Sequence, residues 1–185
     1  MGEQKTNPVL QAIDNSPEIE QEKKYPEGLL QFKDKNWQAF YHCHSTAKDI
    51  QHLFETEHGH FHIFVKVSEQ PVKWSHVVAL SMDELGQPLR WFMVNHWVSG
   101  ETWLESNLFD DLLKYIPYKD QDSVLAQWLM VMLDLYKPEI KELLKKRDAA
   151  LSGLDSEQCL KDRALYLLAE KNINLKEKFA SQNFV

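Results

Sequence analysis

The stretch HGHFHIFVKV, His58–Val67, decides the fold of the sequence around it. Its aromatic and β-branched residues are typical of a β-strand. Successive side chains of a strand point to opposite faces, so Phe61, Ile63 and Val65 share one face and the three histidines share the other. We therefore predict a strand with one apolar face and one histidine face.

Three neighbouring segments have the same strand character, namely Trp37–His44, Ser75–Asp83 and Pro88–Val98. The turn sequence DELGQP at residues 83–88 separates the last two and predicts that they form an antiparallel hairpin. Together the segments predict an antiparallel sheet of about four strands.

The pattern becomes helical after residue 100. We expect helices over Leu104–Ile116, from a cap at Asp122 to Tyr136, from Pro138 to Gly153, and over Leu154–Lys171. Strands followed by a C-terminal set of three to four helices predict an α+β fold, with the helices packed on the sheet.

The 185 residues, with 43% hydrophobic and 11% aromatic content, are enough for one core. Residues 1–27 contain three prolines and many charges, which predicts a loose N-terminal arm with a short helix at Pro17–Lys24. Residues 28–185 are predicted to form one α+β domain, with the sheet over about 37–101 and the helices over 104–185.

Between the first two strands, Ser45 and Asp49 predict a short capped helical turn.

Composition argues against several classes of protein. The formal net charge of −7 does not favour binding to nucleic acid. The first residues do not resemble a secretory signal, and no apolar run approaches the roughly 20 residues of a membrane span. Cys43 and Cys159 cannot make a disulfide framework, so we expect a reducing, cytoplasmic location.

All eight histidines lie between His42 and His96. If the first two strands are neighbours, the alternation of side chains brings five imidazoles to one face of the sheet. These are His42, His44, His58, His60 and His62. Phe40, Phe64, Val78 and Phe92 are expected on the same face, which predicts a pocket with apolar and imidazole walls. His52, His76 and His96 are interpreted as ordinary polar groups.

Histidines two residues apart on a strand can converge on one metal ion. Glu57 or Glu101 could add an oxygen ligand or act as a general base, and Cys43 points to the other face. This donor set suits zinc, iron, manganese or nickel. With an open coordination position, such an ion could activate water or dioxygen or polarise a small-molecule substrate.

The segments EHGHFH, residues 57–62, and NHWVSGE, residues 95–101, carry a first resemblance. They resemble an uncharacterised bacterial family in which a Glu-His-Gly-His-Phe-His strand is followed by Asn-x-Trp-Val-(Thr or Ser)-Gly-Glu. The resemblance covers about residues 37–116 and implies a shared site but no particular reaction. The residues it marks are Glu57, His58, His60, His62, Asn95, Trp97 and Glu101.

The segment HGHFHIF, residues 58–64, also resembles the motif His-φ-His-φ-His-φ-φ, with φ apolar, of the histidine-triad nucleotide hydrolases and transferases. That resemblance implies that His60 is the nucleophile at an α-phosphate, with His58 and His62 orienting it and contacting phosphate. Gly59 departs from the apolar φ position, and in that family the motif lies late in the domain.

A third hypothesis is a non-catalytic binding or adaptor module. The apolar helix at Val124–Leu135 would then matter most, buried either in the core or in a homodimer interface.

Overall fold

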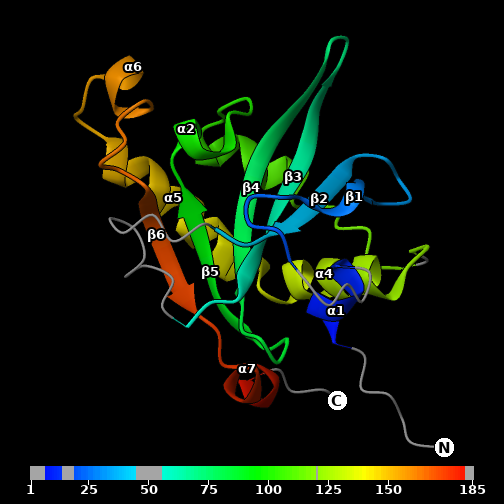
Figure 1. Cartoon of the computed structure of the whole chain (residues 1–185). Coiled ribbons are helices and arrows are strands. Elements are labelled where there is room, and N and C mark those ends of the chain that lie inside the picture. The colour runs from blue at the N-terminus through cyan, green and yellow to red at the C-terminus, as the bar shows by residue number, and fades with distance from the viewer. Residues whose placement is uncertain (1–6, 14–18, 45–55, 120, 182–185) are drawn as a thin grey trace, which may run out of the picture.

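The computed structural model describes residues 7–13, 19–44, 56–119 and 121–181. Its centre is one antiparallel sheet of six strands in the order β1-β2-β3-β4-β5-β6, so each strand pairs with its neighbours in the chain (Figure 1). The strands are β1 (Tyr25–Gln31), β2 (Trp37–His42), β3 (Gly59–Glu69), β4 (Val72–Met82), β5 (Pro88–Val94) and β6 (Leu167–Asn172).

The α+β class and the four central strands are confirmed, as is the antiparallel hairpin of β4 and β5. The expected number of strands was too small, because β1 and β6 extend the sheet at its two edges. All of β6 except its last residue lies in the segment 154–171, for which we predicted a helix. That prediction was wrong, because this segment satisfies its backbone by pairing with the free edge of β5, with Arg90 opposite Asn172 and Val94 opposite Leu167.

The helices of the described residues are α1 (Pro8–Ala12), α2 (His96–Ser99), α3 (Phe109–Leu112), α4 (Val124–Leu135), α5 (Lys137–Leu151), α6 (Ser156–Cys159) and α7 (Leu175–Ser181), with a 3-10 turn, η2, at Ser106–Leu108. α4 and α5 confirm two predicted helices, although the cap of α4 is Ser123 and not Asp122. The helix expected over 104–116 is reduced to η2 and α3.

The N-terminal part differs from the expectation as well. α1 was not predicted, and the described part of the helix expected at Pro17–Lys24, residues 19–24, is not helical. The capped turn predicted from Ser45 and Asp49 lies outside the described residues. None of the helices among the described residues has the length and apolar character needed to cross a membrane.

The main core lies on one face of the sheet, under α4 and α5 (Figure 1). The odd-numbered residues of β2 and β3, such as Tyr41, Phe61 and Ile63, are buried there in the same cluster as Leu129 and Leu133 of α4. Burying each large apolar side chain contributes roughly 1.5–3 kcal/mol, so the alternation fixes which face turns toward the helices. The even-numbered residues, the histidines among them, are therefore held on the opposite face.

Candidate metal centre

The pairing of β2 with β3 sets the centre of the site. His42 lies directly opposite His60, and Phe40 lies opposite His62. Opposite residues of an antiparallel pair have Cβ atoms about 4.5–5.5 Å apart, so the rings are close enough to meet above the sheet. The five-histidine prediction required the first two strands to be neighbours, and the pairing of β2 with β3 meets that condition.

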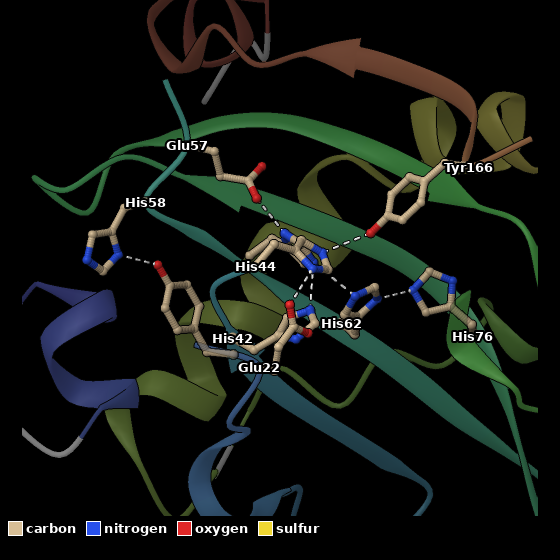
Figure 2. Close-up of polar contacts among 10 residues, drawn as sticks. Glu22, His42, His44, Glu57, His58, His62, His76 and Tyr166 are labelled. Atoms are coloured by element: carbon tan, nitrogen blue, oxygen red, sulfur yellow. Dashed lines mark hydrogen bonds and ion pairs between the residues drawn. The ribbon is translucent and has the colours of Figure 1, made fainter. Parts of the chain in front are cut away.

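The Nε2 atoms of these three histidines converge (Figure 2). His60 Nε2 is 2.8 Å from His42 Nε2 and 3.0 Å from His62 Nε2. All three side chains are buried, His60 completely. Burial and the neighbouring imidazoles lower the pKa of His42 and of His62, so both rings are neutral.

As long as His60 carries a single ring proton, hydrogen bonds between the imidazoles cannot satisfy this arrangement by themselves. The second nitrogen of His60, Nδ1, lies 2.5 Å from Oε1 of Glu57 and donates its proton to that carboxylate. His60 Nε2 then has one in-plane lone pair for two approaching Nε2 atoms, and only one of them can donate to it. A divalent cation would resolve the conflict, because it accepts all three lone pairs at once.

The spacing of the three nitrogens also suits a metal ion. Ligand bonds of about 2.0–2.1 Å to imidazole place two neighbouring nitrogens about 3.0–3.4 Å apart, depending on the bond angle. The observed 2.8 and 3.0 Å are slightly shorter, so small side-chain rotations suffice to open the cluster. His42, His60 and His62 form one group whose ligand atoms all lie within 4.8 Å of one another.

Glu57 lies behind His60. Its side chain is only 5% exposed, and its contact is to Nδ1, the nitrogen that faces away from the cluster. Burial alone would raise the pKa of Glu57, but His60, Ser81 and Arg90 outweigh burial and hold that pKa below its usual value. The carboxylate is therefore charged, and it fixes the tautomer of His60 that directs a lone pair toward the cluster.

His76 on β4 has the corresponding position behind His62, with 2.9 Å between His76 Nε2 and His62 Nδ1. A register shift in the pairing of β3 with β4 is responsible, because Ile63 lies opposite Val78 whereas Phe64 lies opposite His76. This bulge places His76 on the histidine face and Val78 on the core face. Our expectation for Val78 was wrong: Ala79 lies opposite His62 in its place.

His44 lies at the edge of the cluster, just after β2. Its ring centroid is 4.7 Å from that of His42 and 4.9 Å from that of His60. Its Nε2 is 2.8 Å from the hydroxyl of Tyr166, and its Nδ1 is 3.5 Å from a carboxylate oxygen of Glu22. Burial lowers the pKa of His44.

His58 does not join the other four predicted histidines. Its Nδ1 is 2.7 Å from the hydroxyl of Tyr41, a core-face residue, and the two rings stack (Figure 2). The regular strand begins at Gly59, so the alternation of side chains does not extend to His58. Consequently the three histidines of the histidine-triad motif are not gathered on one face of this sheet.

The second motif, residues 95–101, supports the site from outside. β5 ends at Val94, earlier than predicted, because the side chain of Asn95 caps α2 and donates to the carbonyl of Cys159. The indole of Trp97 donates to the carbonyl of Leu165, next to Tyr166. Both residues therefore hold the segment that carries Tyr166.

Glu101 is away from the three converging nitrogens. It lines a small cavity that His76, His96 and Arg147 also line, and burial raises its pKa. Cys43 packs with the main core as expected, and burial raises the pKa of its thiol to about 11. His52 lies outside the described residues.

Three residues of the site were missed in the sequence. His76 has the strand position of a site residue but depends on a bulge that no local signal marks. Tyr166 and Glu22 come from distant segments and carry no motif.

The fold and the site define a class: an α+β protein with a six-stranded antiparallel sheet and a buried histidine cluster that could hold a metal ion. The chain belongs to a family described as a domain of unknown function, DUF6969, whose family model matches residues 1–173. This confirms the predicted membership of an uncharacterised domain family. Comparison with curated proteins and with solved structures gives no significant match.

Proposed function

We propose that this protein binds one divalent transition-metal ion through Nε2 of His42, His60 and His62, and that it is an enzyme acting on a small molecule. The close approach of two Nε2 atoms, those of His42 and His62, to Nε2 of His60 carries the proposal, because with the His60 proton on Nδ1 only one of the two rings can donate a hydrogen bond to it. The groups behind the ligands support it. Metal-bound histidines usually donate their second ring N–H to a carboxylate or another acceptor, and Glu57 and His76 occupy those positions.

Three neutral imidazoles suit zinc, iron, manganese or nickel, all of which accept nitrogen ligands. Glu57 is assigned here to orienting His60 and not to the ligand set, because it contacts the nitrogen that faces away from the cluster. Three protein ligands leave coordination positions open, and a bound ion would there supply Lewis-acid activation of water or substrate.

The residues around the cluster limit what can bind. The rings of Phe40 and Phe92 lie 5.2 Å from His62 and 5.1 Å from His60, respectively, between ring centroids. They exclude water from two sides, whereas His44 and Tyr166 provide polar groups at the edge. Such a confined site favours a small substrate.

Elemental analysis of the protein purified without a histidine tag, after growth with supplemented metals, tests the proposal. We expect about one equivalent of one transition metal per chain that stays bound through purification. His60→Ala and His62→Ala should abolish it, whereas His58→Ala and His96→Ala should retain it, with circular dichroism confirming that each variant is folded. A wild-type protein that stays empty after supplementation would overturn the metal site.

The proposal that the protein is an enzyme needs a separate measurement. The metal-loaded protein and folded His60→Ala should be incubated with pools of small-molecule substrates and analysed by mass spectrometry. Turnover that requires both the metal and His60 is expected. Formation of a phosphoramidate adduct from a nucleotide, dependent on His60 but retained after chelation, would instead support the histidine-triad alternative.

A further inference from the structure

Glu22 is held beside the cluster by its backbone. Its N–H donates to the carbonyl of Cys43 at 2.9 Å, which fixes the loop before β1 against the end of β2. Its φ is +63°, a left-handed conformation that is uncommon for a residue other than glycine. Such conformations persist where the surrounding structure enforces them, often at ligand-binding positions. In this conformation the carboxylate lies 3.5 Å from His44 Nδ1.

The distance between the two side chains is longer than that of most direct hydrogen bonds. His44 Nδ1 and Glu22 Oε1 are 3.5 Å apart, whereas N–H···O bonds are about 2.7–3.2 Å long. Two ligands of one tetrahedral ion, each about 2.0–2.2 Å from it, lie about 3.4 Å apart. The observed distance therefore matches a pair of metal ligands better than it matches a hydrogen-bonded pair.

The other nitrogen of His44 is engaged as in a metal ligand. Nε2 lies 2.8 Å from the hydroxyl of Tyr166, which is buried and can accept the Nε2–H proton. This leaves the lone pair on Nδ1, the atom that faces Glu22. The arrangement repeats that of His60 with Glu57, where one nitrogen is directed at the candidate ion and the other is fixed by a partner.

His42 connects this pair to the first centre. One ligand atom each of Glu22, His42 and His44 lie within 4.8 Å of one another, so His42 belongs to both candidate groups. The two groups differ in exposure. The Glu22 side chain is 55% exposed and that of His44 15%, whereas the first group is buried. A cation held by Glu22 and His44 would therefore exchange with solvent more readily.

We propose that Glu22 and His44, next to His42, bind a second divalent transition-metal ion beside the first. This inference rests on the proposed function, because His42, a ligand of the first ion through Nε2, lies next to the second pair. A carboxylate and an imidazole suit zinc, manganese, iron or nickel. The second ion should bind more weakly than the first, since fewer buried groups hold it.

Equilibrium dialysis of the metal-free full chain against Zn²⁺, followed by elemental analysis, tests the second site. We expect about two equivalents in the wild type, one tight and one weak. Glu22→Gln and His44→Gln should each leave only the tight equivalent. Glu20→Gln, in the same loop but paired with Lys23, and His96→Gln should keep both. Circular dichroism should show that every variant is folded.

A second readout uses Mn²⁺ as the probe. The wild type loaded with two Mn²⁺ ions should give the electron paramagnetic resonance spectrum of a coupled pair, and Glu22→Gln should give that of an isolated ion. A single equivalent in the wild type overturns the second site and leaves the first intact. Loss of all metal in His44→Gln also overturns it, because His44 would then be a ligand of the first ion. A chain that binds no metal refutes both proposals.

Discussion

At the scale of single residues, the site depends on which nitrogen each imidazole turns toward the cluster. His60 and His62 both present Nε2 and have Nδ1 fixed from behind, one by a carboxylate and the other by a second imidazole. The tautomer of each ring is thus set before a metal arrives, which lowers the cost of ordering the ligands on binding.

Changing Glu57 to glutamine tests this arrangement. The negative charge of Glu57 stabilises the Nδ1–H tautomer of His60 and makes Nε2 a stronger ligand. The amide of glutamine removes that charge. Metal affinity should fall by about 10–100-fold, the usual range for such partners, with little change in fold. Competition with a fluorescent chelator measures it. The control is Glu84→Gln. Glu84 is an exposed acid that lines, together with Glu57, a pocket at the surface, and this variant should bind metal like the wild type.

His76 and His58 form a matched pair of histidines at two ends of the site. His76→Ala removes the partner of His62 Nδ1 and should weaken metal binding by about 10–100-fold. His58→Ala removes only a contact to Tyr41 and should leave the affinity within about twofold of the wild type. Calorimetric titration distinguishes the two, and equal losses in both variants would contradict the geometry.

At the scale of secondary-structure elements, the site depends on how closely β2 and β3 approach. Gly59 permits this approach, because a Cβ at that position would lie 2.6 Å from the carbonyl oxygen of His42 and 2.6 Å from the hydroxyl of Tyr41. One of those obstacles is backbone, which cannot rotate away.

Gly59→Ala should therefore force β2 away from β3 near His42 and His60. We expect a loss of about 1–3 kcal/mol in the free energy of unfolding, the usual cost of overpacking, together with weaker metal binding. Urea denaturation and metal titration measure the two effects. Ser68→Ala, further along β3 and only partly buried, should change neither.

The faces of the strands could be predicted from the sequence only in part. Alternation of apolar and histidine residues predicted the faces of β2 and β3, and with them the meeting of His42, His60 and His62. It failed for His58, where the regular strand had not yet begun, and for Val78, where a bulge changes the parity. His76 was missed because we interpreted it as an ordinary polar group. Tyr166 and Glu22 reach the site through tertiary packing, which depends on segments far away in the sequence.

At the scale of the whole molecule, the sheet divides two environments. One face packs against α4 and α5 and supplies most of the buried apolar surface. The other buries several imidazoles against a smaller apolar cluster of Ala79, Phe92, Val94 and Tyr166. The fold thus buries polar rings at a cost in stability that a bound metal would offset.

This cost makes the stability of the metal-free protein depend on pH. Burial, followed by nearby charged groups, lowers the pKa values of His42, His62 and His76 below the ordinary 6.5. In the unfolded chain these rings take up protons near pH 6.5 that the folded chain does not bind, so stability falls as the pH drops below about 6.5. Each ring contributes roughly 1.4 kcal/mol per pH unit in that range.

Urea denaturation of the metal-free protein between about pH 8 and about pH 5.5 should therefore show nearly constant stability above about pH 7 and a loss of a few kcal/mol below it. A free metal concentration 100 times Kd should raise the free energy of unfolding by about 2.7 kcal/mol. This stabilisation should be largest at neutral pH, because protons compete with the metal for the same lone pairs in acid. A metal-free protein as stable at about pH 5.5 as at neutral pH would show that the rings are not buried as neutral groups.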